Sequence, residues 1–374
     1  MRSKSLRRDF EITDFETAKA LIVWNALVEP GDRVAGELIR TFGPVDALAA
    51  FTSKRDLGDE VRDAFARWEP RYSPSLAEVR IAAAKRNDLK LLLPSDALWP
   101  SSFRDLGNHA PLLIWYRGNL GHFERLDRPV GIVGSRNATH YGQRVTSELS
   151  ALLVQEEAAV VSGGALGIDS VAHRTALSLG GLTIAFMAGS LDCMYPSANF
   201  ELFEKIANQG LLLSEMSPGA RPTRWRFLQR NRLIAALSVA TVVTEAGWRS
   251  GSINTVNHAL ELQRPVYAIP GPITSPASAG CNRLIRDFQA SLLLDVSELP
   301  AELGWRAEAQ GELAGLGSLE LRTLDVLTTG FQGMERLLIE SGLSLGELRM
   351  ALGSLKLLGK VESEVSGSWR LVKN

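Results

Sequence analysis

The sequence has little of what defines disulfide-rich, metal-binding or membrane proteins. Its 374 residues include only two cysteines, Cys193 and Cys281, which lack the paired spacing of a zinc site or a disulfide framework. No stretch approaches the roughly 20 apolar residues that cross a bilayer. The acids Asp9, Glu11 and Asp14 stand where a secretory signal would need its apolar core. These absences predict a reduced, cytoplasmic protein with no membrane span, no metal and no cofactor.

The chain also lacks net charge, because 41 Lys and Arg residues oppose 42 Asp and Glu residues and leave a formal charge of −1. Its positive charge is instead concentrated locally. Residues 221–232 hold five arginines and no acid, interleaved with Trp225 and Phe227. Arginine binds phosphate through parallel hydrogen bonds and stacks on bases, as aromatic rings also do. The segment therefore indicates a site for an anionic, aromatic ligand, and single-stranded nucleic acid is the leading hypothesis.

The alternative for this segment is a solvated loop whose arginines pair with nearby acids. Against it, the apolar run 233–237 follows at once, so the last arginines are expected to open a buried helix. If all five arginines neutralised one phosphate each, the logarithm of the affinity for single strands would fall with log salt at a slope of about −3.5.

Hydrophobic spacing predicts three regions. From residue 15 to 68, apolar residues recur every three or four positions, and Pro-Gly or Gly-Pro pairs separate short helices. We expect residues 1–75 to form a small helical module of the helix-hairpin-helix or SAM-like kind. Such a module is compatible with contact to a DNA backbone and equally with packing or dimerisation.

The middle region, residues 76–300, alternates short apolar runs with segments of helical length. Continuous apolar runs are typical of buried parallel strands. Strands that alternate with helices predict right-handed βαβ units, so we expect an α/β fold with an extended Rossmann-like, doubly wound, mostly parallel sheet. The expected strands are 89–93, 112–116, 130–133, 159–162, 182–187, 211–214, 240–244, 266–269 and 291–294.

The last region begins with a Gly, Ala and Glu-rich linker at residues 301–317. Three helical segments and a short hairpin follow in residues 318–374, which is the order of a winged helix. Winged helices often bind duplex DNA, but the expected recognition helix carries few bases, Arg349 and Lys356. Contact with a protein is an equally good expectation for this domain.

Three loops follow expected strands and enter helices, and each is rich in glycine and serine. Ligands of doubly wound sheets bind at the carboxyl ends of the strands, where backbone N–H groups at helix starts receive phosphates. None of the loops has the Rossmann fingerprint or the P-loop pattern. Together they predict one extended phosphate-binding surface. The residues concerned are Gly134, Ser135 and Arg136, then Ser162, Gly163 and Gly164, then Arg249, Ser250, Gly251 and Ser252.

Catalytic groups are not apparent in the sequence. His173 and His258 fall inside expected helices, where a half-buried histidine with its hydrogen bonds made is the common case. Asp169 is expected to hold its loop, and Glu245 to cap the helix after it. We therefore expect a protein that binds and is no enzyme. The runner-up is a nucleotide-processing enzyme resembling phosphoribohydrolases, with Glu245 in the site, although their Pro-Gly-Gly-x-Gly-Thr signature is absent.

These motifs together resemble the DprA family, DNA-processing protein A. The resemblance covers about residues 89–294, and the order of the three regions also fits. The matching residues are Ile132 to Arg136 with Tyr141-Gly142; Ser162-Gly163 with Gly167-Ile168-Asp169 and Ala172-His173; Leu191-Asp192 with Tyr195-Pro196 and Asn199; Ser214-Glu215; Phe227 with Arg230 to Ile234; Glu245-Ala246; Ser250 to Ser252; Pro270-Gly271; and Gly280, Asn282, Leu284 and Ile285.

The resemblance implies a single-stranded DNA-binding protein of natural transformation, which protects incoming strands, loads the RecA recombinase and dimerises through its Rossmann-like domain. It also implies roles for individual residues. Arg136, Arg230 and Arg232 would bind the DNA backbone, and Phe227 would stack on a base. Ser162, Gly163, Ser250 and Gly251 would line the phosphate track, and Asn231 would brace its loop or hydrogen-bond a base. The expected site also includes Gly134, Ser135, Gly164, Arg224, Arg226, Arg249, Ser252 and Asn282.

One position departs from the family pattern. Leu166 stands where relatives usually have a basic residue, so one DNA contact is expected to be lost. Arg224, Arg226 and Arg249 are the candidates to compensate for it. The sequence does not indicate the residues of the dimer or RecA interfaces.

Overall fold

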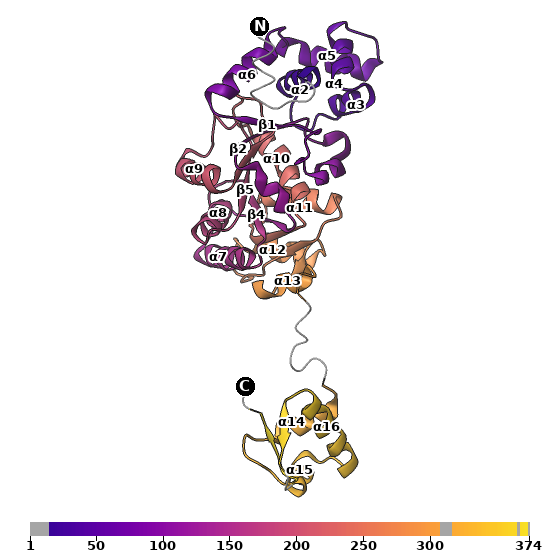
Figure 1. Ribbon diagram of the computed structural model, residues 1–374, viewed down its shortest axis with the longest axis vertical. Coiled ribbons are helices and arrows are strands. Elements are labelled where there is room, and N and C mark those ends of the chain that lie inside the picture. Colours follow the sequence, from indigo (N-terminus) through magenta and orange to yellow (C-terminus); the bar gives the residue numbers. More distant parts are fainter. Residues whose placement is uncertain (1–14, 307–315, 365–366, 373–374) are drawn as a thin grey trace. The chain divides into compact units, whose positions relative to one another are not determined.

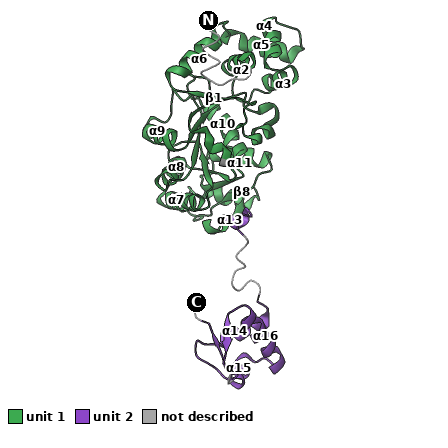
Figure 2. Ribbon diagram, in the orientation of Figure 1, with its two compact units in different colours: residues 1–299 green, residues 300–374 purple. Residues whose placement is uncertain are grey.

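The computed structural model describes residues 15–306, 316–364 and 367–372. Contacts divide the chain into two compact units, residues 1–299 and residues 300–374 (Figure 2). The first unit holds the large sheet and the helices around it, and the second is a small helical unit with a strand pair.

A nine-stranded sheet runs through the first unit in the order β1-β2-β6-β5-β4-β3-β7-β8-β9. β2 pairs antiparallel with both β1 and β6, and every other pair is parallel. All nine strands lie where the sequence predicts them, and the mostly parallel, doubly wound arrangement is confirmed. The strands are β1 Lys90–Leu92, β2 Ile114–Gly118, β3 Pro129–Gly134, β4 Ala159–Ser162, β5 Thr183–Met187, β6 Leu211–Ser214, β7 Ala240–Glu245, β8 Val266–Ala268 and β9 Ser291–Leu292.

Helices cover both faces of the sheet, as Figure 1 shows. β5 illustrates why, since side chains alternate across a strand. Ile184 and Phe186 join one buried cluster with α10 and α11, whereas Ala185 and Met187 join another with α9. The helices of this region are α7 His140–Gln155, α8 Ile168–Ser178, α9 Phe200–Gln209, α10 Arg224–Leu237, α11 Ser252–Glu261, α12 Ala279–Arg286 and α13 Leu299–Glu302. The short 3-10 helices are η1 Glu69–Arg71, η2 Ser101–His109, η3 Leu120–Arg125, η4 Ser197–Asn199 and η5 Val296–Glu298.

Five α-helices of the described residues precede the sheet and share its core. Trp24 is fully buried and packs edge-on against Trp68, and the same cluster continues into strands β2 and β5. The buried Asn25 accepts a hydrogen bond from Nε1 of Trp115 (3.0 Å) and donates one to the carbonyl of Glu215 (2.6 Å). The helices thus belong to the same compact unit as the sheet, and a separate domain over residues 1–75 stays a prediction. They are α2 Phe15–Leu27, α3 Arg33–Phe42, α4 Pro44–Thr52, α5 Asp59–Trp68 and α6 Leu76–Arg86.

The second unit has its own core, which includes Leu337, Leu348 and Leu352. Its order is helix, single β-bridge at Gln332, two helices and a strand pair, and Trp369 pairs with Gln332. The three helices and hairpin predicted from the sequence are present in this order. The elements are α14 Ser318–Val326, α15 Met334–Ser341, α16 Leu345–Leu357, β10 Val361–Ser363 and β11 Trp369–Leu371. Among all described helices, none has the length and apolar character needed to span a membrane.

Candidate nucleic-acid interface

A pocket of about 530 Å³ opens at the carboxyl ends of β3 and β7. From β3 the chain continues to β4, β5 and β6 on one side of β3, whereas β7, β8 and β9 lie on the other side of β3. The strand order therefore reverses between β3 and β7, and ligands of doubly wound sheets bind at such a switch point. The loops after β3, β4 and β7 and one side of α10 form its wall. The lining residues are Val133 to Asn137, Ala165, Asp169, Phe227, Leu228, Arg230, Asn231, Ile234, Gly247, Arg249 to Ser252 and Thr255.

Two positions in these loops require glycine: Gly134, where the loops contact one another, and Gly163, where Arg230 of α10 contacts the loop after β4. A Cβ atom on Gly134 would lie 2.6 Å from Cγ1 of Ile168 and 2.7 Å from the carbonyl oxygen of Glu245. A Cβ atom on Gly163 would lie 2.3 Å from the guanidinium of Arg230. The absence of side chains here lets three loops and one cation pack into a single wall.

Arg230 is the charged group at the centre of this wall. Its side chain is buried, and Nη1 donates hydrogen bonds to the carbonyls of Gly163 (2.5 Å) and Phe186. Burial lowers the pKa of Arg230 to about 10, so the guanidinium stays charged at neutral pH. A cation held in this way is pre-organised for an anion and loses little side-chain entropy on binding.

Asp169 balances that charge from the loop after β4. Its carboxylate accepts hydrogen bonds from the backbone N–H groups of Gly163 and Ala165, both at 3.2 Å. Burial raises the pKa of Asp169, while the charge of Arg230 acts in the opposite direction. Asp169 therefore holds its loop, as the sequence indicates.

Phe227 carries the aromatic part of the pocket. The guanidinium carbon of the exposed Arg136 lies 4.9 Å from its ring centroid, and that of Arg230 lies 6.0 Å away. Tyr195 meets the same ring edge-on, with centroids 5.9 Å apart. Two cations and two aromatic rings thus converge at one place, which suits a ligand with both phosphate and base.

The loop after β7 forms the opposite wall and leads into α11. Arg249 and Gly251 are exposed, and the Ser250 and Ser252 hydroxyls lie 2.8 Å apart at the helix start. The first N–H groups of this helix are used within the turn. Ser252 N–H donates to the hydroxyl of Ser250 (3.4 Å), Ile253 N–H to the carbonyl of Ser250 (3.2 Å), and Asn254 N–H to the carbonyl of Gly251 (3.2 Å). Asn231 reaches across from α10 and donates a hydrogen bond to Oδ1 of Asn254 (3.1 Å).

Ten of the seventeen residues predicted from the sequence line this pocket. They come from two loops, those after β3 and β7, and from helix α10, which are far apart in the chain. The loop after β4 lines the pocket through Ala165 instead of its predicted residues Ser162, Gly163 and Gly164. The ten residues are Gly134, Ser135, Arg136, Phe227, Arg230, Asn231, Arg249, Ser250, Gly251 and Ser252.

Arg232 is not brought into the pocket. It is buried, and two of its nitrogens donate to the carboxylate oxygens of Glu215, both at 2.8 Å. Its Nε donates to the carbonyl of His109 (2.9 Å). Its charge is neutralised inside the protein, so the expected contact of Arg232 with a DNA backbone is corrected to a structural role.

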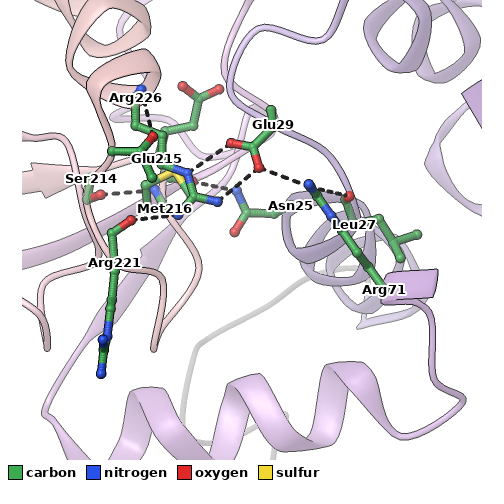
Figure 3. Close-up of polar contacts among 10 residues, drawn as sticks. Asn25, Leu27, Glu29, Arg71, Ser214, Glu215, Met216, Arg221 and Arg226 are labelled. Atoms are coloured by element: carbon green, nitrogen blue, oxygen red, sulfur yellow. Dashed lines mark hydrogen bonds and ion pairs between the residues drawn. The ribbon is translucent and has the colours of Figure 1, made fainter. Parts of the chain in front are cut away.

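Arg226 also binds within the protein. Figure 3 shows Arg226 beside Glu29, whose carboxylate accepts hydrogen bonds from Nε and Nη2 of Arg226 (both 2.9 Å). Glu29 also forms an ion pair with Arg71 (3.1 Å). The hydrogen bond from Arg226 is the main cause that holds the pKa of Glu29 below its usual value. Arg226 therefore joins the start of α10 to the N-terminal helices. Arg224 is exposed and lies outside the pocket lining.

Four further predicted residues brace loops from behind the pocket wall. The buried Ser162 donates to the carbonyl of Ile132 (2.6 Å), and the carbonyl of Gly163 receives Arg230. Gly164 leaves room for the ring of Phe203, whose nearest atom lies 2.7 Å from the position of a Cβ. The side chain of Asn282 accepts a hydrogen bond from the N–H of Gly271 (3.2 Å) and donates one to the carbonyl of Gly271 (3.0 Å). None of the four lines the pocket.

Glu245 corrects another expectation. Its buried carboxylate accepts hydrogen bonds from the N–H (2.9 Å) and hydroxyl (2.5 Å) of Thr139, the N-cap of α7. It thus supports α7, rather than capping the helix that follows it, and it does not line the pocket. The nucleotide-hydrolase hypothesis needs this carboxylate in the site, so the geometry does not support it.

His173 is buried in α8, with Nδ1 2.7 Å from the hydroxyl of Thr183. Burial lowers the pKa of His173 to about 3, so the ring is neutral at physiological pH. Among the described residues, no group of His, Cys, Asp or Glu is arranged to hold a metal. The pocket residues that the sequence did not indicate include Asn137, Ala165 and Thr255. Tyr195, which packs against Phe227 from outside the lining, was not indicated either. Of the residues that match the family, Tyr195-Pro196 is the motif that could have indicated Tyr195.

Fold and pocket together define a Rossmann-like protein that binds a ligand combining negative charge with aromatic rings. The family profile described as DNA recombination-mediator protein A matches residues 90–304. The chain belongs to this family of recombination mediators.

Individual relatives support this assignment. The chain is 36% identical over 387 residues to the putative DNA processing protein DprA of Mycobacterium tuberculosis, covering 96% of this chain and 95% of the relative. It is 44% identical over 179 residues to DNA processing protein DprA of Streptococcus pneumoniae, covering 48% of this chain and 62% of that one. The X-ray structure of the S. pneumoniae protein superposes with a TM-score of 0.65 at 29% identity, covering 78% and 99% of the chains.

A second solved structure shows the single-stranded DNA binding mode of DNA processing protein A from Helicobacter pylori. It superposes with a TM-score of 0.53 at 31% identity and covers 58% of this chain and 96% of that one.

Proposed function

We propose that this protein binds single-stranded DNA in the switch-point pocket and loads the RecA recombinase onto it. The observation that carries the proposal is the convergence of Arg136, Arg230 and Phe227 in one pocket, opposite the loop after β7. The arginines would receive phosphates, and the Phe227 ring would stack on a base. The binding mode named for the H. pylori relative supports the same ligand.

The charge of the pocket supports a polyanion. Three arginines line it, Arg136, Arg230 and Arg249, and its one acid is Asp169, which is turned toward backbone N–H groups. A protein with a net charge of −1 is thereby able to attract DNA at one place without attracting it everywhere.

Family membership supports the proposal of RecA loading, because a recombination mediator acts between single strands and a recombinase. We propose that the mediator serves natural transformation, protects incoming strands and works in the cytoplasm, where such strands meet RecA.

The salt dependence of binding tests the proposal. With three arginines in the pocket, we expect log affinity for an oligothymidylate to fall with log salt at a slope of about −2, from roughly −0.7 per phosphate contact. Fluorescence anisotropy over a salt series measures it, with duplex DNA as competitor. A flat dependence, or equal affinity for duplex, would overturn the proposal. A slope near −3.5 would mean that arginines outside the pocket also bind.

We also propose that the protein forms a homodimer through the free edge of β9. Apolar side chains are exposed there: Phe288 is 97% exposed and Leu294 is 72% exposed. Unpaired sheet edges with apolar side chains favour association. We expect Leu294→Glu to convert a dimer into a monomer, as measured by light scattering after gel filtration. Leu179→Glu, at an exposed leucine after α8, is the matched control and should stay dimeric. A wild-type monomer at micromolar concentration would refute this interface.

A further inference from the structure

We propose that Trp248 is a second base-stacking platform, which extends the DNA site out of the pocket toward α12. The inference rests on the proposed function, since it names where the next nucleotide of the same strand binds. Trp248 lies in the loop after β7, between Gly247 and Arg249, and both of these neighbours line the pocket. The tryptophan itself lies outside the lining and is 52% exposed.

The ring of Trp248 is held by an arginine. The guanidinium carbon of Arg283, on α12, lies 4.6 Å from the ring centroid. A cation at this distance covers one side of the indole and limits its rotation, while half of the residue stays open to solvent. A ring fixed in this way loses little entropy when a base stacks on it.

The loop that carries Trp248 is also fixed. The N–H of Gly280, in the first turn of α12, donates a hydrogen bond to the carbonyl of Ala246 (2.7 Å). A Cβ atom on Gly280 would lie 2.5 Å from the carbonyl oxygen of Gly247, so helix and loop are in backbone contact. Trp248 is therefore presented by a supported loop.

The charges around Trp248 favour a nucleic acid over an apolar partner. Arg249 precedes the start of α11 and Arg283 stacks on the ring, and neither forms a salt bridge within the described part of the chain. The nearby Asp287 pairs with Arg286 instead (2.8 Å). An open indole that is covered on one side by Arg283, and that is followed in the chain by Arg249, provides one base contact and two cations for phosphate, which are the groups of one more nucleotide.

Trp225 provides a comparison within the same chain. It is 54% exposed, but it lies in the first turn of α10, outside the pocket lining, and no arginine lies over its ring among the described contacts. Exposure alone therefore does not single out Trp248. Its stacked arginine and its position between two pocket residues do.

The test compares Trp248→Leu, Trp248→Phe and Arg283→Gln with the wild type, using labelled oligothymidylates of about 4 and about 12 nucleotides. We expect Trp248→Leu to weaken binding of the longer strand by at least about fivefold, the low end for one base stack, and to leave the shorter strand unaffected. Trp248→Phe keeps a flat ring and should recover most of the loss. Arg283→Gln should give an intermediate loss. Thermal unfolding of each variant confirms that it is folded.

Other outcomes separate the two proposals. If the wild type binds the longer strand and Trp248→Leu binds it equally, the platform is refuted and the pocket stands. An equal loss for both strand lengths would place Trp248 inside the pocket site and refute the extension. A loss of the same size in Trp225→Leu would also refute the assignment to this loop. If the wild type binds neither strand, the proposed function fails, and the platform with it.

Discussion

Replacing Arg232 with alanine is expected to lower the free energy of unfolding by about 3–5 kcal/mol, because it leaves the carboxylate of Glu215 buried without its partner. Both side chains are almost fully buried, and their two hydrogen bonds measure 2.8 Å. The DNA affinity of the folded variant should be unchanged, since Arg232 does not line the pocket. Urea unfolding measures the first effect and anisotropy the second.

Two variants serve as controls for Arg232. Arg224→Ala removes an exposed arginine of the same helix and should change stability by no more than about 0.5 kcal/mol. The double variant Arg232→Met, Glu215→Leu removes both charges and should lose less stability than Arg232→Ala alone. A stable Arg232→Ala protein that fails to bind DNA would contradict the structural role.

Replacing Phe227 with alanine should weaken single-strand binding by about 1–3 kcal/mol, or about 5- to 150-fold, because one base loses its stacking surface. Arg136, whose guanidinium lies 4.9 Å from the Phe227 ring, should behave differently. Arg136→Ala should reduce the magnitude of the salt slope by about 0.7, the contribution of one phosphate. Phe227→Ala should leave that slope unchanged. Anisotropy over a salt series with both variants measures these effects.

An arginine and a phenylalanine in the second unit, Arg370 and Phe331, provide the control for the Phe227→Ala measurement. Arg370 lies over the ring of Phe331 at 4.4 Å, an arrangement like that of Arg136 and Phe227 but away from the pocket lining. Phe331→Ala should bind DNA like the wild type. If Phe227→Ala also did so, the pocket would not be where bases stack.

The sheet could be predicted from the sequence because its strands are buried. Parallel strands that are covered on both faces have continuous apolar sequences, as in Val130–Val133 and residues 159–161. Such sequences can be recognised without knowing which strand pairs with which. The convergence of the three loops was predictable for a related reason. Carboxyl ends of parallel strands lie at one edge of a sheet, so the loops after β3, β4 and β7 had to meet.

The roles of the arginines were not predictable in the same way. Arg226, Arg230 and Arg232 lie on one helix and look alike in the sequence, but only Arg230 lines the pocket. Arg226 pairs with Glu29, 197 residues earlier, and Arg232 pairs with Glu215. No local pattern indicates which acid will lie beside which arginine. Glu245 was misassigned for the same reason, since its partner Thr139 is 106 residues away.

The departure at Leu166 gains a structural meaning. Leu166 is 45% exposed next to the pocket residue Ala165, so the loop after β4 offers no cation at that side. The exposed cation of the opposite wall is Arg249. On the β4 side the positive charge therefore comes from Arg230 of α10, which donates a hydrogen bond to the carbonyl of Gly163.

The contacts of Glu29 and Asn25 determine where this chain can be divided in a chimera. Glu29 binds the first turn of α10, and Asn25 bonds the Glu215 carbonyl in the segment that precedes it. The helix that carries Phe227 and Arg230 is thus held at its start by Glu29, which follows α2, and the segment before it is held by Asn25 in α2. A chimera joined near residue 75 would combine the donor's helices with a foreign α10 and lose these contacts. A join at that point therefore separates the two sides of these contacts, because the N-terminal helices and the ligand-binding helix form one structural unit.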